Sequence, residues 1–267
     1  MKRIIHLSDL HVGHEECGIK FRTIIDSITL LEQPAKNYII LITGDIVDNA
    51  NHGEQTDEAV GAIKQLEDRG YRVLVVPGNH DYGTGVLGNE KFVGLFKKKY
   101  YGSRRISYPK LDIIDEIAFI GLDSTAEELH RIDRFLSEGE LGLAQLRRLK
   151  RILKRPEVAG CRKVVYLHHH PFDFKLWMQL KDSYELKKII ENKIDMLLFG
   201  HYHKDPNIAR RTNNGTWGIP RCYNGGSSTH KNGDTGYQRI IDLSSEDPAT
   251  DYDGNFIEKG EGQRAEV

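Results

Sequence analysis

The sequence predicts an α/β fold in which helices flank a core sheet. Apolar runs of strand length alternate with segments of helical periodicity through most of the 267 residues, and this alternation is typical of such folds. Five short polar blocks, rich in histidine, aspartate and glycine, each follow directly after one of the apolar runs. Because strand ends in an α/β sheet are where ligands and metals are held, the five blocks are candidates for one functional site.

The first hundred residues are expected to form three strands and three helices. Strands are predicted over residues 3–7, 38–42 and 71–77, and helices over Ile19–Leu31, Gln55–Arg69 and Gly88–Tyr100. The pattern then changes to three short consecutive apolar runs, at Ile106–Tyr108, Asp112–Ile114 and Ile117–Ile120. Such runs indicate short antiparallel strands.

The second half of the chain returns to the alternating pattern. A helix is predicted over Glu140–Lys154, where Leu141, Ala144, Leu149 and Ile152 give an amphipathic face, although Gly142 weakens it. Strands are predicted over 164–167, 196–199 and 237–243. From Ser244 the chain is acidic and polar, so we expect one domain over residues 1–243 and a loosely ordered tail over 244–267.

The charge and cysteine content argue against several classes of protein. With 38 basic and 39 acidic residues the net charge is -1, which gives no electrostatic case for a nucleic acid partner or an anionic membrane surface. The basic clusters 97–99 and 147–151 fall on predicted helices and are expected to be solvated faces. The three isolated cysteines, Cys17, Cys161 and Cys222, argue against a disulfide framework and for a reducing compartment.

The sequence has no recognisable targeting or membrane segment. Met1 leads within a few residues into a strand, without the features of a signal peptide. No apolar run approaches the ~20 residues that a bilayer-spanning helix needs. We therefore expect a cytoplasmic protein with no membrane partner.

The polar blocks place oxygen and imidazole ligands at strand ends. They are Asp9-Leu10-His11, Gly44-Asp45-Ile46-Val47-Asp48, Gly78-Asn79-His80-Asp81, His168-His169-His170-Pro171 and Gly200-His201-Tyr202-His203. Alternate side chains of an extended segment share a face, so an Asp-x-His or His-x-His pair can direct two ligands toward one point. With Asp45, Asn79 and one histidine of the triplet there are enough ligands for two ions that share a bridging carboxylate, and too many for one tetrahedral zinc.

Each block alone has a plainer interpretation. An Asp-x-His pair can be a strand-end carboxylate beside an exposed histidine, and Gly-Asp-x-x-Asp can be a turn or a helix cap. The histidine triplet can be half buried, with one ring bonded to a backbone carbonyl. The occurrence of all five blocks in one chain favours the metal site. Oxygen and nitrogen ligands without cysteine suit manganese, iron(II) or zinc.

Taken in this order, the five blocks resemble the signature of the calcineurin-like metallophosphoesterases. The resemblance extends from Lys2 to about Leu243. It implies a four-layer α/β/β/α sandwich of two mixed sheets, with a dinuclear metal site at their edge. It also implies a ligand assignment: Asp9, His11 and His203 hold one metal ion, Asn79, His169 and His201 hold the other, and Asp45 bridges the two.

The choice of histidine within the triplet rests on the same resemblance. In family members the ligand often stands two residues before a proline, and Pro171 then selects His169. His168, which is still in the strand register, is the alternative.

Two metal ions and a histidine that is not a ligand suggest a mechanism and roles for further residues. A hydroxide bound to the two ions attacks phosphorus in line, without a phosphoenzyme. His80, beside Asn79, is the candidate acid or electrostatic stabiliser, and Asp48 could orient its ring. A simple hydrogen bond to a ligand is the alternative role for His80. Substrate binding is assigned to His14, Asn79 and His80, although His14 could equally be a solvated loop residue.

The region from Ile120 to Pro171 is similar to the bacterial class III cyclic nucleotide phosphodiesterases. This similarity implies a small phosphodiester substrate such as a 3′,5′-cyclic nucleotide. Three aromatic residues after the histidine triplet, Phe172, Phe174 and Trp177, could stack on a base, although packing onto the core is favoured.

Other functions remain compatible with the same residues. A phosphomonoesterase or a protein phosphatase would use the same metals. The near-neutral charge argues against a nuclease. The complete set of ligands argues against a noncatalytic binding scaffold.

Overall fold

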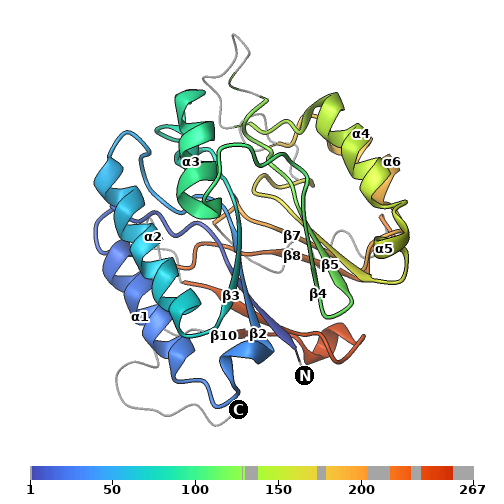
Figure 1. The fold of residues 1–267 in the computed structure, drawn as a ribbon, viewed down its shortest axis with the longest axis horizontal. Coiled ribbons are helices and arrows are strands. Elements are labelled where there is room, and N and C mark those ends of the chain that lie inside the picture. The colour runs from blue at the N-terminus through green and yellow to red at the C-terminus, as the bar shows by residue number, and fades with distance from the viewer. Residues whose placement is uncertain are drawn as a thin grey trace.

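Two five-stranded sheets pack face to face in the computed structural model, and helices cover the outer face of each sheet (Figure 1). The structure describes residues 2–127, 129, 138–172, 179–203, 217–229 and 236–254. One layer of helices, two sheets and a second layer of helices make the α/β/β/α sandwich. The fold predicted from the sequence and its resemblance is therefore confirmed.

The first sheet has the strand order β10-β9-β1-β2-β3. Its strands are β1 (Arg3–Leu7), β2 (Tyr38–Thr43), β3 (Arg72–Val76), β9 (Gln238–Asp242) and β10 (Tyr252–Gly254). The first three run parallel to one another, whereas β9 and β10 are antiparallel to their neighbours. Its outer face is covered by α1 (Cys17–Thr29), α2 (Gly53–Asp68) and α3 (Lys91–Tyr101).

The second sheet has the order β4-β5-β6-β7-β8. Its strands are β4 (Lys110–Ile114), β5 (Ile117–Gly121), β6 (Arg162–Tyr166), β7 (Met196–Phe199) and β8 (Arg221–Asn224), and only β4 is antiparallel to its neighbour. Helices α4 (Gly142–Ile152), α5 (Pro156–Ala159) and α6 (Ser183–Ile190) lie on its outer face. Short 3-10 helices occur at Ala35–Asn37, His80–Tyr82 and Pro248–Thr250.

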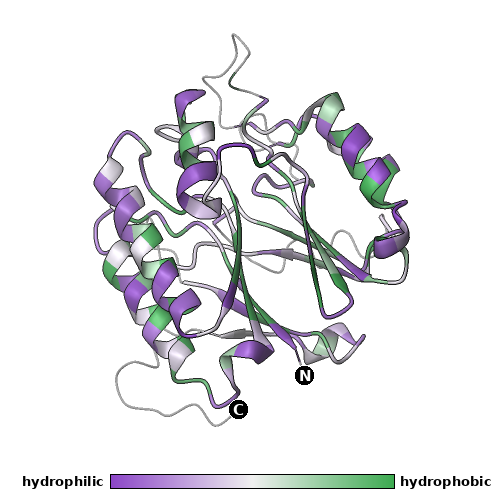
Figure 2. Cartoon of the chain, viewed as in Figure 1, coloured by the Kyte–Doolittle hydropathy of each residue, from purple (hydrophilic) through white to green (hydrophobic). Residues whose placement is uncertain are grey.

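Strand β2 shows why its sequence is apolar throughout. Alternate side chains of a strand point to opposite faces of the sheet. Ile40 and Ile42 lie in the core beneath the helices, and Ile39 and Leu41 lie in the core between the sheets. Every residue of β2 is buried. Figure 2 shows the same division, with hydrophobic strands inside and helices that are hydrophobic on one side only.

Two element predictions differ from the structure. The run Ile106–Tyr108 was expected to be a strand and is not one. Tertiary contacts hold it instead, because Tyr108 is buried with its hydroxyl 2.7 Å from that of Tyr101, and its carbonyl accepts a hydrogen bond from Arg148. Helix α3 begins at Lys91 and not at Gly88, because Gly88 pairs with Gly83 in a short bridge.

The first sheet continues past the domain boundary expected at Leu243. Strand β10 pairs with β9, and the Asp251 carboxylate accepts a hydrogen bond from Tyr223 and forms an ion pair with Arg221. Residues 244–254 are thus part of the sandwich, and residues 255–267 lie outside the described residues. Among the helices that are described, none has both the length and the apolarity to cross a membrane.

Candidate metal centre

The polar blocks meet where the strands of both sheets end. Strands β1, β2 and β3 end at one edge of the first sheet, and β6 and β7 end at one edge of the second sheet. Each block follows one of these ends. The described residues contain three overlapping groups whose potential ligand atoms lie within 4.8 Å of one another: Asp9, His11 and His203; His11, Asp45 and His80; and Asp45, His168 and His201.

The first group joins β1 to the loop after β7. Nε2 of His203 lies 3.1 Å from Oδ1 of Asp9, and Nε2 of His11 lies 3.3 Å from Nε2 of His203. Asp9 and His11 are fully buried, whereas 20% of the His203 side chain is exposed. The group therefore sits at the surface of the protein with two of its three members anchored inside.

Asp45, His168 and His201 form, together with Asn79, what is called the second group from here on. This group joins the ends of β2, β3, β6 and β7. Nε2 of His168 lies 3.0 Å from Oδ1 of Asn79, 3.1 Å from Nδ1 of His201 and 3.4 Å from Oδ2 of Asp45. The four side chains are all buried. Three kinds of ligand atom, from a carboxylate, an amide and two imidazoles, therefore face one point.

Asp45 lies between the two groups. Its Oδ2 is 3.4 Å from Nε2 of His168 and 3.9 Å from Nε2 of His11. Its other oxygen accepts a hydrogen bond of 2.8 Å from the backbone N–H of His80. This bond fixes the carboxylate while Oδ2 faces both groups.

The expectation that His169 lies with Asn79 and His201 as a ligand is not met by the geometry, which has His168 in that place. Nδ1 of His169 lies 2.8 Å from Oγ of Ser124, and its ring packs beside that of His201 at 4.5 Å. His168 is the residue that points to Asp45, because it continues the alternation of β6. The family pattern of a histidine two residues before proline selected the neighbour on the other face.

The ring hydrogen bonds determine which nitrogen faces each group. A carbonyl oxygen can only accept, so Nδ1–H of His168 donates to Thr43 O at 2.7 Å and leaves Nε2 for the site. Nδ1–H of His80 likewise donates to Asp48 O at 2.5 Å. Histidines that bind metals commonly donate the second ring N–H in this way.

Asp48 acts on two histidines through different atoms. Its carboxylate is 3.4 Å from Nδ1 of His11 and 3.9 Å from Nδ1 of His80. We expected the carboxylate of Asp48 to orient the His80 ring, whereas the backbone carbonyl of Asp48 accepts its hydrogen bond. The carboxylate is better placed to orient His11.

The electrostatics of the second group favour a positive charge. Burial alone would lower the pKa of His168, but the Asp45 carboxylate beside it raises that pKa to about 9. Burial and, to a lesser degree, the neighbouring His168 lower the pKa of His201 to about 3, so His201 keeps a free lone pair. Burial would raise the pKa of Asp45, yet the surrounding histidines hold it well below its usual range.

The residues present fit a pair of divalent cations. Nε2 of His168 and Nδ1 of His201 are both buried and face each other at 3.1 Å, beside the acceptor oxygens of Asn79 and Asp45. Carboxylate, amide and imidazole ligands without thiolates are those of manganese, iron(II) and zinc sites. A cation between these side chains would satisfy the ligand atoms that no protein donor reaches.

The backbone at the site is held in an uncommon conformation. Asp9, His11, Asp45 and His201 have φ values of 52°, 44°, 49° and 69°, in the left-handed region that non-glycine residues rarely adopt. Such strain concentrates at functional sites, where the surrounding structure enforces it. Gly44 has φ 89°, and a Cβ atom there would lie 2.7 Å from Nδ1 of His168.

Two supporting residues were missed by the sequence reasoning. The buried Asp81 carboxylate accepts hydrogen bonds from the backbone N–H groups of Gly78, Ile46 and Val47 at 2.9 to 3.2 Å. It thereby ties the loops of Asp45 and Asn79 together. Ser8 donates a 2.5 Å bond to Oδ2 of Asp9. Their places within or beside the polar blocks were the available signal.

The residues predicted to bind substrate have different outcomes. Asn79 and His80 lie at the centre, whereas the side chain of His14 is in none of the three groups of described residues. Phe172 packs against Phe199 and Trp217, with ring centroids 5.7 and 4.6 Å away. Phe174 and Trp177 lie outside the described residues.

Comparison with known protein families gives one match over most of the chain. The sequence profile described as calcineurin-like phosphoesterase matches residues 2–205. A probable cyclic nucleotide phosphodiesterase of Coxiella burnetii is 23% identical over 221 residues, which cover 78% of this chain and 79% of that protein. The DNA double-strand break repair protein Mre11 of Sulfurisphaera tokodaii is 23% identical over 212 residues, 75% of this chain, which thus spans 49% of that relative.

Solved structures show the same fold at low identity. The TT1561 protein of Thermus thermophilus is 12% identical, with a TM-score of 0.57 over 96% of this chain and 99% of that chain. The calcineurin-like phosphoesterase YfkN of Bacillus subtilis is 13% identical, with a TM-score of 0.53 over 90% of this chain and 83% of that chain.

Proposed function

Because the chain belongs to the calcineurin-like phosphoesterase family and is thus a hydrolase of phosphoesters, we propose that it is a phosphodiesterase that acts on small diesters such as cyclic nucleotides. Two divalent metal ions are proposed as its cofactors. Cytoplasmic location stays a prediction.

The observation that carries the proposal is the position of Asp45 between two groups of ligands. Asp9, His11 and His203 are proposed to hold one ion, and Asn79, His168 and His201 the other. Ions bound there would supply Lewis-acid activation of a water and of the phosphoryl oxygens. Manganese, iron and zinc remain the candidates.

His80 is proposed to protonate the leaving oxygen. Its Nδ1–H is committed to Asp48 O, so Nε2 is the nitrogen that can exchange a proton with the substrate. Asp45 receives the backbone N–H of the same residue, which fixes His80 relative to the ligands. An alkyl ester such as 3′,5′-cAMP needs this step more than an aryl ester, because an alkoxide is a poorer leaving group than a nitrophenolate.

The preference for a cyclic nucleotide is supported by the relative from Coxiella burnetii, which matches along most of both chains. The similarity to Mre11 covers half of that protein, and the net charge of -1 gives little attraction for DNA. A phosphomonoesterase is the competing function, since the same ligands would serve it.

The test is turnover of bis-p-nitrophenyl phosphate, p-nitrophenyl phosphate and 3′,5′-cAMP in parallel, with Mn²⁺, Fe²⁺ or Zn²⁺ added to metal-depleted protein. The proposal predicts metal-dependent turnover of both diesters. It also predicts that His80→Ala lowers kcat for 3′,5′-cAMP by ~10²-fold or more, as for a lost general acid, and has a smaller effect on bis-p-nitrophenyl phosphate, whose phenolate leaves without a proton. Turnover of the monoester alone would make the protein a phosphatase.

A further inference from the structure

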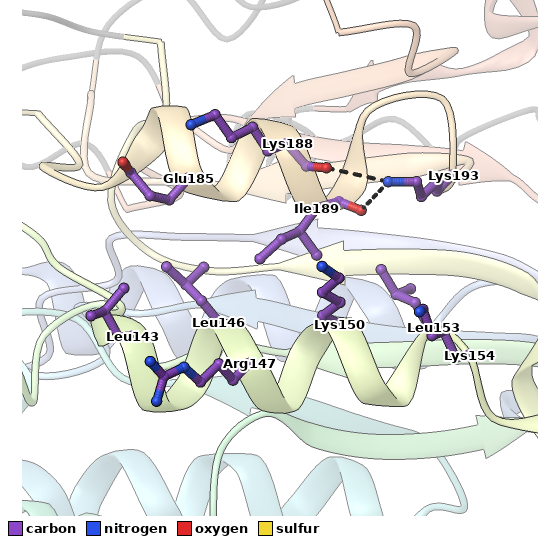
Figure 3. Close-up of a pocket in the computed structure, with 10 residues that line it drawn as sticks. All are labelled: Leu143, Leu146, Arg147, Lys150, Leu153, Lys154, Glu185, Lys188, Ile189 and Lys193. Carbon is purple, nitrogen blue, oxygen red and sulfur yellow. Dashed lines mark hydrogen bonds between the residues drawn. The ribbon is translucent and has the colours of Figure 1, made fainter.

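A groove of about 410 Å³ runs between α4 and α6 on the outer face of the second sheet (Figure 3). The side chains of Leu146, Leu153 and Ile189 lie between the two helices and form its apolar floor. Leu143 stands at one end and is 64% exposed. None of the residues that line the groove is in the candidate metal centre.

The residues that α4 and the turn after it contribute to the groove form one stripe. They are Leu143, Leu146, Arg147, Lys150, Leu153 and Lys154, and residues three or four apart among them share one face. At 1.5 Å per residue, the stripe is about 16 Å long, or three helical turns. The groove is therefore open and long enough to hold about three turns of a bound helix.

The rim of the groove is strongly basic. Arg147 and Lys150 line it from α4 and Lys154 from the turn after that helix, and Lys188 and Lys193 line it from α6 and the turn after it. Glu185 is the acid among the ten lining residues. Nζ of Lys193 donates to the carbonyls of Lys188 and Ile189 at the end of α6, which holds this cation at the groove. The chain as a whole has a net charge of -1, so the rim is a local concentration of positive charge.

We propose that this groove is the docking site for an acidic amphipathic helix of a partner protein. A ridge of leucine-like side chains spaced i, i+3, i+4 and i+7 would fill the apolar floor. Glutamate and aspartate on its flanks would face the cations of the rim. The charge pattern selects the occupant, because it favours acidic sequences over neutral or basic ones with the same ridge.

The shape and composition of the groove disfavour other occupants. A membrane meets convex apolar surfaces, whereas here the apolar residues form a floor below charged ones. Nucleic acid would leave the apolar floor uncovered. A second copy of this chain offers acidic residues on α2, but the apolar residues of that helix, such as Ile63 and Leu66, are buried in its own core.

The test is binding of a labelled peptide of about 16 residues, with leucines in the i, i+3, i+4, i+7 pattern and glutamates elsewhere, followed by fluorescence anisotropy. One control peptide has lysine in place of every glutamate, and a second has the same composition in scrambled order. Two protein variants disrupt the groove: Lys150→Glu with Lys154→Glu for the rim, and Leu143→Ser for its apolar end. Lys64→Glu with Lys98→Glu, on exposed positions of α2 and α3, is the matched control.

The acidic peptide is expected to bind at low salt and to protect α4 and α6 from hydrogen exchange. The rim variant should weaken binding by about tenfold or more, since it replaces two attractions by two repulsions. Leu143→Ser should also weaken it, and the α2 and α3 control should not. All variants should keep wild-type turnover of the phosphoester substrate.

The proposal is overturned if the lysine or scrambled peptide binds as well as the acidic one, or if the rim variant binds it unchanged. Two other results would assign the groove to another occupant. One is co-sedimentation with anionic phospholipid vesicles that the rim variant abolishes. The other is a dimer in sedimentation velocity that Leu143→Ser dissociates.

Discussion

The two sheets contribute to the candidate metal centre in different ways. The loops of the first sheet brace one another: Asp9 N–H donates to Gly44 O, His11 N–H to Asp45 O, and the Asp81 carboxylate binds the loops after β2 and β3. The second sheet brings His168, His201 and His203, and the first two of these are braced mainly against the first sheet. Nδ1–H of His168 donates to Thr43 O, and His201 N–H donates to Oδ2 of Asp9.

The ligands from the first sheet are therefore held by bonds within that sheet's own loops. The position of the ligands from the second sheet depends on how the two sheets pack. The core between the sheets includes Leu41, Val76, Phe119, Tyr166 and Leu198. These side chains set the distance at which His168 meets Asp45. A substitution that removes a hydrogen bond between the loops of the first sheet should therefore weaken metal binding at both groups. A substitution of one histidine from the second sheet should weaken it at one group.

The largest effect is expected for Asp45, because it belongs to both groups. Asp45→Asn should lower kcat/KM by at least ~10³-fold, or about 4 kcal/mol of transition-state stabilisation. Metal content measured on the same sample should fall for both ions. Retention of one full equivalent would show that Asp45 serves one group only.

The next largest effect is expected for Gly85→Ala, which should lower kcat by about 10²-fold because it displaces His80. A Cβ atom at Gly85 would lie 2.2 Å from Nε2 of His80, and φ there is 85°. The Gly85 carbonyl also accepts a hydrogen bond of 2.8 Å from Nδ2 of Asn79, so metal content is measured beside kcat. A fall in kcat with metal content near wild type assigns the effect to His80. Gly61→Ala, where nothing lies within 4 Å of the added atom, is the control. An unchanged kcat in the Gly85 variant would remove His80 from the proton transfer.

The brace at Asp81 should give an intermediate effect, since it holds the ligands without touching the substrate. Asp81→Ala leaves the backbone N–H groups of Gly78, Ile46 and Val47 without their acceptor. The free energy of unfolding should drop by about 1–3 kcal/mol, and metal affinity by about 10–100-fold. Denaturant unfolding and metal titration measure the two. Loss of stability with unchanged metal affinity would separate the brace from the centre.

Asp48 is expected to have the smallest effect. Its carboxylate is 3.4 Å from Nδ1 of His11 and 26% exposed, so Asp48→Asn keeps the shape and the carbonyl bond to His80. Metal affinity should fall about tenfold, at the low end for residues that orient a ligand. A fall in kcat with unchanged metal affinity would instead support the role for the carboxylate at His80.

The comparison of the sheets also explains how far the sequence could predict the site. The structure brings Asp9, His11, Asp45 and Asn79 together, and each of them follows a strand whose apolar pattern is plain in the sequence. The choice between His168 and His169 depends on where β6 ends and on its register against the first sheet, which local sequence does not contain. The same holds for Ile106–Tyr108, whose strand-like pattern is overridden by burial of Tyr108 between the sheets. Asp81 stands in one of the polar blocks, but its sequence position does not show that its carboxylate binds the backbone of two loops.

The most direct test of the proposed centre is the metal stoichiometry of three proteins side by side: the wild type, His168→Ala and His169→Ala, reconstituted with Mn²⁺ and measured by elemental analysis. The geometry predicts two ions per chain in the wild type, one ion in His168→Ala and two in His169→Ala. Loss of an ion from the His169 variant, with two retained in the His168 variant, would contradict the assignment of His168 as the ligand that the second sheet brings to Asp45.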